Sequence, residues 1–185
     1  MLKLAKIFHN PYFEKNERSK LGTHIVLLVL LSCAVYSNTL NNSFHLDDFY
    51  RVVNNPGIEK VWPISRHFVD PSTMSTLPRI TEYRPMLPLS LSINYAISGL
   101  SLPGYHLVNI GIHTLAAIVI YFLCLELLGQ TSTLQNQSRR RRWLALMVAA
   151  VFVVHPVSGF PANYICGRDL LMMELFLMSS FLNKR

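Results

Sequence analysis

Two adjacent carboxylates, Asp47 and Asp48, stand among aromatic residues in the stretch SFHLDDFYRVVN, residues 43–54. A positioned carboxylate can accept a proton from an attacking hydroxyl group, so the pair is a candidate general base. The simpler interpretation is a solvated loop, because acidic side chains are mostly exposed. The groups that the fold places around the pair decide between these interpretations.

Two arginines could bind a phosphate group in such chemistry. Arg84 stands between Tyr83 and Pro85, and Arg168 follows Gly167. A guanidinium group matches the oxygens of a phosphate in a bidentate manner. For Arg168 the alternative is a side chain that anchors a helix by reaching toward water. A general base together with arginines that bind phosphate would suit group transfer from a phosphate-linked donor.

Further polar groups recur at helical spacing. His106, Asn109 and His113 are separated by three and four residues, which places them on one face of a helix. Together with His155, which precedes Pro156, they could orient reacting groups. Hydrogen bonding between packed helices is the alternative for such buried polar side chains.

The composition shows what kind of scaffold must hold these residues. Of 185 residues, 51% are hydrophobic and 15% are charged, against roughly 25% charged in soluble domains. The net charge of +7 comes from clumps beside apolar runs, which is not the pattern of a nucleic-acid surface. The cysteines Cys33, Cys124 and Cys166 lack metal-ligand spacing, so we expect them to pack as small apolar residues.

We therefore predict an all-α integral membrane protein with about four transmembrane helices. A span needs about 20 mostly apolar residues, and the candidates are residues 21–40, 105–128, 143–160 and 164–182. His155-Pro156 interrupts the third, and Arg168, Asp169 and Glu174 weaken the fourth. The first is interpreted as an uncleaved anchor, since no small-residue cleavage site follows it.

Basic clusters predict the orientation. Lysines and arginines gather within residues 1–20, at 139–142 and at 184–185, and short cytoplasmic segments collect such residues. A cytoplasmic N-terminus and a cytoplasmic loop at 129–142 follow. Residues 41–104 then face the lumen of the endoplasmic reticulum or the bacterial periplasm.

That outer segment is too long for a simple connection. Seven prolines divide it into short pieces: Pro56, Pro63, Pro71, Pro78, Pro85, Pro88 and Pro103. Within Leu87–Leu100, residues Leu87, Leu91, Asn94 and Tyr95 recur at helical spacing, so we predict a short helix on the membrane surface. A strand is the alternative, because LSLSI also alternates.

Three stretches together resemble a known family. HLDDFYRVVNNP (45–56), EYRPMLPLSLSINYAISGLSLPGYHLVNIGIHTLAA (82–117) and VFVVHPVSGFPANYICGRDLLMMELF (151–176) are similar to the N-terminal part of the O-mannosyltransferases with tetratricopeptide repeats, and to their bacterial relatives. The resemblance implies a polytopic glycosyltransferase of the C type. Such an enzyme moves a sugar, here mannose, from a polyprenyl or dolichyl phosphate to a Ser or Thr hydroxyl of a protein.

The resemblance also implies roles for individual residues. The acidic residue of the first outer loop is the catalytic base, which corresponds to Asp47 or Asp48, with Asp47 preferred. Phosphate contact carries over to Arg84 and Arg168. No cofactor is expected, although a bound divalent ion would make the aspartates its oxygen ligands.

The chain stops at FLNKR, where such enzymes continue through further spans and repeats. We therefore expect an N-terminal module, either truncated or completed by a partner chain. The alternative function is a non-catalytic membrane subunit that packs against another polytopic protein. Lipid bilayer, lipid-linked sugar donor and protein acceptor are the expected partners.

Overall fold

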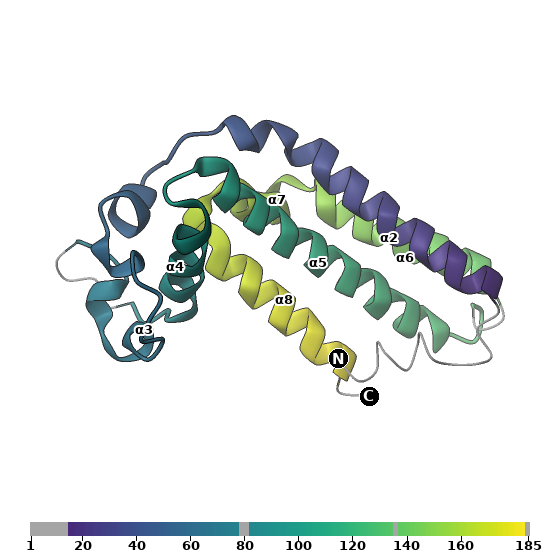
Figure 1. Ribbon diagram of the computed structural model, residues 1–185. Helices are drawn as coiled ribbons and strands as arrows, with labels where there is room; N and C mark the ends of the chain where they lie inside the picture. Colours follow the sequence, from purple (N-terminus) through teal and green to yellow (C-terminus); the bar gives the residue numbers. More distant parts are fainter. Residues whose placement is uncertain (1–14, 78–81, 135–136, 184–185) are drawn as a thin grey trace. The chain divides into compact units, whose positions relative to one another are not determined.

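The computed structural model describes residues 15–77, 82–134 and 137–183, and every regular element in these ranges is helical. The predicted all-α class is thus confirmed. The elements are α2 (Lys15–Tyr36), η1 (Ser37–Asn41), η2 (Phe49–Val53), η3 (Pro56–Ile58), α3 (Arg66–Val69), η4 (Pro71–Thr73), α4 (Met86–Ser98), α5 (Leu102–Gly129), α6 (Ser138–Val154), α7 (Pro156–Asn163), η5 (Ile165–Gly167) and α8 (Arg168–Asn183). Figure 1 shows them in sequence colours.

The chain divides into two compact units. The helical unit contains the described parts of Met1–Val35, Ile112–Gly159 and Met173–Arg185, and the loop unit contains Tyr36–Gly111 and Phe160–Met172. Both units are discontinuous in sequence. The chain passes from one to the other four times: at the end of α2, within α5, within α7 and within α8.

Small side chains pack the helical unit. Ala116 and Ala117 of α5 and Ala145 and Ala149 of α6 are all 0% exposed. Alanine allows helix backbones to approach closely, as is common in membrane bundles. Larger side chains such as Leu28 and Tyr121 are buried between them, while many other large apolar side chains lie on the outside.

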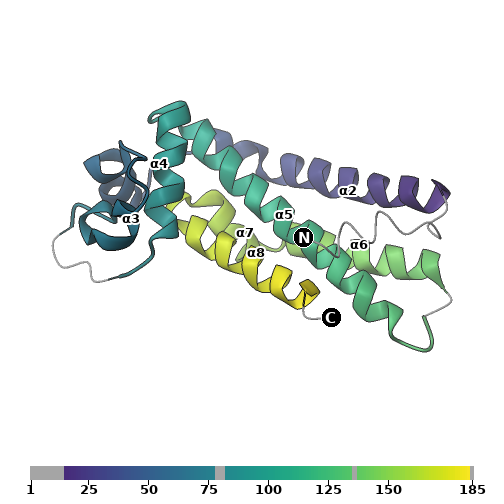
Figure 2. The same ribbon diagram turned by 60° about the horizontal axis from the view of Figure 1, so that its bottom comes forward.

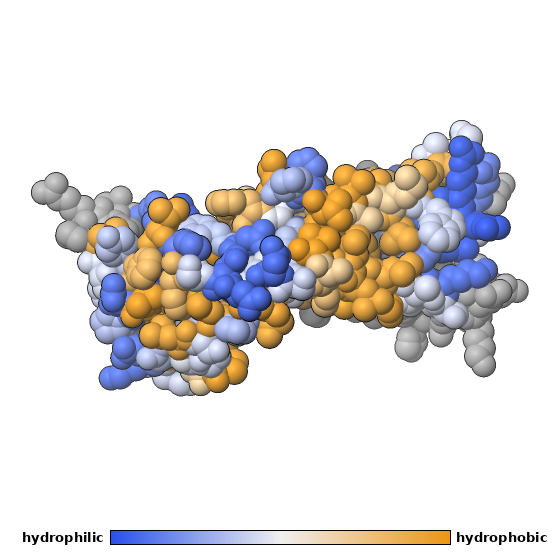
Figure 3. Space-filling model, turned by 90° about the horizontal axis from the view of Figure 1, so that it is seen from above, coloured by the Kyte–Doolittle hydropathy of each residue, from blue (hydrophilic) through white to orange (hydrophobic). Residues whose placement is uncertain are grey.

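The exposed face of α2 carries Val26, Leu27, Val29 and Leu30. Figure 3 shows this face from above, apolar in the middle and hydrophilic at its right-hand end. Such a surface would be unfavourable in water and suits contact with lipid. The chain is accordingly a membrane protein.

Two helical stretches are long and apolar enough to cross a bilayer, Ser19–Asn41 and Leu102–Gly129. A third span results if the bent pair Ser138–Val154 and Pro156–Asn163, at 54° to each other, is one span. The break lies at His155-Pro156, as the sequence indicated, because proline lacks the amide that would continue the helix. Among the described residues the count is thus two or three, and α8, with 16 residues, stays a predicted fourth span.

The loop unit holds the segment between the first two spans. Its core contains seven buried residues: Val52, Ile58, Leu87, Leu91, Tyr105, Ile165 and Cys166. α4 contacts η3 and α3, and α3 lies beside α4 in both Figure 1 and Figure 2. The segment between the first two spans is therefore a folded structure.

The helix predicted over Leu87–Leu100 is present as α4, Met86–Ser98, so the strand alternative is wrong. Leu87, Leu91 and Asn94 form its buried face, at 1%, 1% and 4% exposure. α4 ends at Gly99, whose φ of 56° is in the region that glycine adopts without strain. Its predicted place on a membrane surface stays a prediction.

The cysteines differ from the sequence expectation in one case. Cys166 is buried and Cys124 is half-buried, as expected, but Cys33 is exposed on α2, where the helix presents apolar residues outward. The basic residues within 1–14 and at 184–185, used to predict orientation, lie outside the described residues.

Candidate functional site in the loop unit

The two adjacent aspartates have opposite environments. Asp48 is 1% exposed, and its two carboxylate oxygens accept hydrogen bonds from separate backbone amides. Oδ2 accepts from His45 N at 3.0 Å, and Oδ1 accepts from Cys166 N at 3.1 Å. Asp48 therefore ties the start of the segment between the first two spans to η5, which is over a hundred residues later in the chain.

Asp47, in contrast, points outward with 55% of its side chain exposed. The turn before it contains Leu46, whose positive φ of 49° is uncommon for a residue with a Cβ. The neighbours Leu46, Phe49 and Tyr50 are exposed by 78%, 45% and 42%. Asp47 is therefore an accessible carboxylate with apolar side chains around it.

A row of alternating charges extends from Asp47. Its members, here called the ion-pair line, are Asp47, Arg51, Glu82, Arg84 and Asp169. Arg51 Nε lies 3.6 Å from Asp47 Oδ2, and Arg51 Nη2 donates to Glu82 Oε2 at 3.0 Å. Arg84 Nη2 lies 3.3 Å from Glu82 Oε2, and Arg84 Nη1 donates to Asp169 Oδ2 at 2.6 Å. With three carboxylates and two guanidinium groups, the line has a formal charge of −1.

The members of this line differ in their access to solvent. The Arg51 side chain is only 7% exposed, whereas Arg84 and Glu82 are each 46% exposed. The hydrogen bond from Arg51 and the charge of Arg84 lower the pKa of Glu82, so Glu82 is ionised at neutral pH. Arg84 is held by two carboxylates and yet remains open to a ligand.

Arg168 lies in a different setting, with 0% exposure. Its guanidinium donates to Asn109 Oδ1 at 2.7 Å, Asn94 Oδ1 at 2.9 Å, and the backbone oxygens of Ser90 and Tyr105, both at 3.1 Å. We call these five residues the Arg168 network. All four acceptors are neutral, and among the described residues no carboxylate lies within ion-pair distance of Arg168.

Asn109 connects this network to η5. While its Oδ1 accepts from Arg168, its Nδ2 lies within 2.9 Å of Tyr164 O and 3.3 Å of Pro161 O. Gly167 also fits closely here, since a Cβ at that position would lie 2.9 Å from Pro161 Cα. The network thus fixes the backbone that carries Asp169 into the ion-pair line.

The histidines have separate surroundings. His106 is 1% exposed, and neither ring nitrogen has a hydrogen-bond partner among the described residues. His113, also buried, stacks on Phe152 at 4.8 Å between ring centroids. His155 belongs to the helical unit, is exposed, and its Nδ1 accepts from Val157 N at 3.2 Å. The predicted polar face of His106, Asn109 and His113 is buried as a whole.

The loop unit therefore contains the predicted residues Asp47, Asp48, Arg84, Arg168, His106 and Asn109, but not His155. The sequence interpretation missed Arg51, Glu82 and Asp169. Arg51 could have been found, because it stands four residues after Asp47 on a helical stretch, where opposite charges meet. In the described part of the chain, no three His, Cys, Asp or Glu residues are grouped to hold a metal ion.

Comparison with known proteins finds relatives of one kind. The chain is 30% identical over 158 residues to the mouse protein O-mannosyl-transferase TMTC1, covering 83% of this chain and 16% of the relative. It is 31% identical over 169 residues to the Caenorhabditis elegans protein O-mannosyl-transferase F38B6.6, covering 89% and 23%. With human TMTC4 it shares 31% identity over 166 residues, covering 84% and 22%.

The chain thus spans about a fifth of the length of these relatives. No family model matches the sequence, and no solved structure matches it.

Proposed function

Because this chain is similar over most of its length to the TMTC protein O-mannosyl-transferases, we propose that it is a module of a membrane glycosyltransferase. The module takes part in moving a mannose from a polyprenyl or dolichyl phosphate to a Ser or Thr hydroxyl of a protein. The lipid-linked donor suits an exposed carboxylate that stands among exposed apolar side chains.

The contrast between the two aspartates carries this proposal. A general base needs a carboxylate that reaches the acceptor hydroxyl. Asp47 is exposed, and its ion pair with Arg51 is long, at 3.6 Å. Asp48 is engaged by His45 N and Cys166 N on its two oxygens. Asp47 is therefore the base, and Asp48 is a positioning residue that fixes the turn presenting it.

Arg84 is the proposed contact for the donor phosphate. It is 46% exposed and is held by Glu82 and Asp169, so its guanidinium is oriented before a ligand arrives. A phosphate can replace one of these carboxylates on Arg84 while the other keeps the side chain in place.

Arg168 and Asn109 support the site indirectly. Arg168 is fully buried and its guanidinium contacts four neutral acceptors. The expectation of a phosphate contact at Arg168 therefore gives way to a positioning role, in which it fixes the start of α8 and with it Asp169. His106 stays a proposed orienting residue of the loop unit, where it is 1% exposed. For His155, which belongs to the helical unit, we propose no role at this site.

The first outer segment faces away from the cytosol in this proposal, with the N-terminus cytoplasmic. The test is labelling with a membrane-impermeant thiol reagent on a background lacking Cys33, Cys124 and Cys166. A cysteine at Ser72 should be modified in intact cells or sealed vesicles, and one at Ser132 only after permeabilisation. The reverse pattern would contradict the orientation.

The relatives extend far beyond the matched region. We propose that further chain, continuous or from a partner, completes the acceptor side of the site. A non-catalytic membrane subunit is the second candidate function. It is favoured by one observation: both arginines of the ion-pair line already contact carboxylates of this chain.

Sugar transfer distinguishes the two functions. Membranes containing the natural full-length protein would receive dolichyl phosphate mannose with a labelled sugar, and transfer to protein would be measured. Asp47→Asn should lower turnover by about 100-fold to 10,000-fold at unchanged expression. Glu59→Gln, an exposed carboxylate of the same segment, is the matched control and should transfer normally. If Asp47→Asn and Asp48→Asn both transfer sugar at the unmodified rate, neither aspartate is the base and the subunit function remains.

Arg84 is tested in the same membranes by binding of the donor. Arg84→Lys keeps the positive charge but not the planar fork, so it should bind the donor about as weakly as Arg84→Ala. If both variants bind the donor with unchanged affinity, Arg84 has only a structural role.

A further inference from the structure

The helical unit contains a hollow that the proposed chemistry does not use. Its volume is about 370 Å³, and the residues lining it come from α2 and α6: Lys20, Thr23, His24, Leu27, Arg139, Arg142 and Trp143. A ring contact and a hydrogen bond, both made by His24, hold its wall. His24 lies 5.1 Å from Trp143 between ring centroids, and its Nδ1 is hydrogen-bonded to Tyr121 Oη at 3.0 Å.

The lining is strongly positive. Lys20, Arg139 and Arg142 contribute three cations from two helices, and none of the seven lining residues is acidic. Arg139 and Arg142 also stand in the first turns of α6, which begins at Ser138. The amide groups of a helix start add a partial positive charge for an anion.

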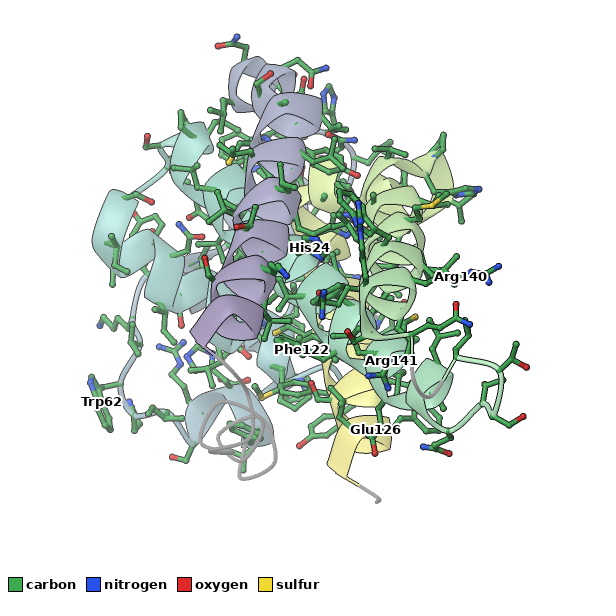
Figure 4. All side chains as sticks on the ribbon, turned by 90° about the vertical axis from the view of Figure 1, so that its right-hand side faces the viewer. His24, Trp62, Phe122, Glu126, Arg140 and Arg141 are labelled. Carbon is green, nitrogen blue, oxygen red and sulfur yellow. The ribbon has the colours of Figure 1, made fainter. Side chains whose placement is uncertain are left out.

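The hollow stands at the end of a candidate span. Lys20 is the second residue of the apolar stretch Ser19–Asn41, so the cations are level with the boundary between hydrocarbon and headgroups. Trp143 is 50% exposed, and tryptophan is enriched at this depth of a bilayer. Figure 4 looks at this end, where His24 of α2 points toward α6 and Arg140 points away.

The same hollow continues into an apolar surface. Leu27 lines it and is 43% exposed, and the adjacent Val26 and Leu30 are 55% and 59% exposed. A ligand with a phosphate head and an acyl chain could place its head among the cations and its chain along α2. A soluble phosphate would contact only the cations.

We propose that this hollow is a binding site for the phosphate headgroup of an anionic phospholipid. Lys20, Arg139 and Arg142 bind the phosphate, Trp143 lies beside the headgroup, and Leu27 contacts the upper part of an acyl chain. The site anchors the α2 and α6 ends at one membrane surface, independently of the sugar-transfer site in the loop unit.

Trp143 itself reports on occupancy. The chain has two tryptophans, and Trp62 stands in the loop unit, 74% exposed and directed outward in Figure 4. A Trp62→Phe variant of the full protein therefore leaves one fluorophore in this chain's hollow, and natural tryptophans in any further chain would be replaced likewise. This variant would be reconstituted in phosphatidylcholine bilayers. One set contains brominated phosphatidylglycerol and the other contains brominated phosphatidylcholine, at equal mole fraction.

We expect brominated phosphatidylglycerol to quench Trp143 more than brominated phosphatidylcholine does. Lys20→Gln with Arg139→Gln, both exposed residues, should remove this excess, with affinity falling about fivefold per charge. The control double variant replaces Lys60 and Arg141. This removes the same charge from residues that line neither this hollow nor the adjoining one, which contains Arg140. Circular dichroism checks that both double variants keep their helices.

Three results would overturn the proposal. Equal quenching by the two brominated lipids would exclude selective binding, and equal losses in the two double variants would show a diffuse surface charge. The third concerns the source of the phosphate: inorganic phosphate would be added to the single-tryptophan protein in phosphatidylcholine alone. A fluorescence response to millimolar phosphate, without excess quenching by the anionic lipid, would assign the site to a soluble anion.

Discussion

The loop unit contains two arginines, Arg84 and Arg168, that the chain uses in opposite ways. Arg168 is fully buried on neutral oxygens, and Arg84 is half-exposed between two carboxylates. The residue after Arg168, Asp169, is the one that holds Arg84. The Arg168 network and the ion-pair line are therefore neighbouring regions, one with an arginine on neutral acceptors and the other with an arginine on carboxylates.

Their difference follows from the cost of burying charge. A buried cation needs every donor satisfied, which restricts Arg168 to a fixed arrangement. An exposed ion pair adds little stability, because water screens the charges. The exposed pairs can consequently be exchanged for a ligand at small cost, whereas the buried network holds the backbone that aligns them.

The largest expected effect is on the buried side. Arg168→Met should lower the stability of the folded protein by about 3–5 kcal/mol, because Asn94, Asn109 and two backbone oxygens would lose a charged donor. Arg84→Met is the matched control and should change stability by about 0.5 kcal/mol or less. Heat unfolding in detergent, followed by circular dichroism, measures both. Similar midpoints for the two variants would remove the distinction between the regions.

The second effect applies the same comparison to the aspartates. Asp48→Asn leaves one backbone amide facing an NH₂ group, so we expect a loss of about 1–3 kcal/mol. Asp47→Asn should be nearly neutral for stability. Hydrogen exchange localises the change, since the amides of His45 and Cys166 should lose protection only in Asp48→Asn. Protection that persists in both variants would show that Asp48 is not the link between the segments.

The smallest effect is on pH dependence. Burial, followed by the charge of Arg66, lowers the pKa of His67 below its ordinary value of 6.5. The unfolded chain then binds the proton more readily, so stability is full above pH 6.5 and falls as the pH drops below it, by at most about 1.4 kcal/mol per pH unit. Unfolding midpoints between pH 7.5 and 5.5 should show this fall, and His67→Phe should reduce it.

Glu82 is an exposed group whose pH dependence can be compared with that of the buried His67. Its pKa lies below the ordinary value of 4.5, so its contribution is lost only as the pH falls below 4.5. The two pH ranges are separate, which allows the buried histidine and the ion-pair line to be measured in one titration. A single transition below pH 4.5 would mean that His67 contributes nothing.

Local patterns predicted the helices well. The spacing of Leu87, Leu91 and Asn94 indicated α4, and Pro156 marked the end of α6. The first span begins earlier than expected, at Ser19 rather than residue 21, because a helix continues into polar residues once it has formed. The number of spans depends on bends and short helices, which hydropathy does not resolve.

The candidate site was less predictable. Sequence identified Asp47 and Asp48 but could not distinguish them, since adjacent residues share every local pattern. Their difference depends on Cys166 N, which is distant in the chain. Arg168 was expected to contact a ligand because its real partners are also distant in the chain. Its four acceptors lie between residues 90 and 109, and no spacing rule links them to Arg168.

The position of Arg168 in the chain has a consequence for biosynthesis. All its acceptors are made earlier by the ribosome, on α4 and α5. Until residue 168 has emerged, Asn94 and Asn109 have no guanidinium to bind, and the loop unit lacks its second segment, Phe160–Met172. The unit can therefore reach its final state only after a late part of the chain returns to an early one. A nascent chain halted between residues 111 and 160 would expose these amides, which makes that interval the stage at which quality-control factors should recognise the protein.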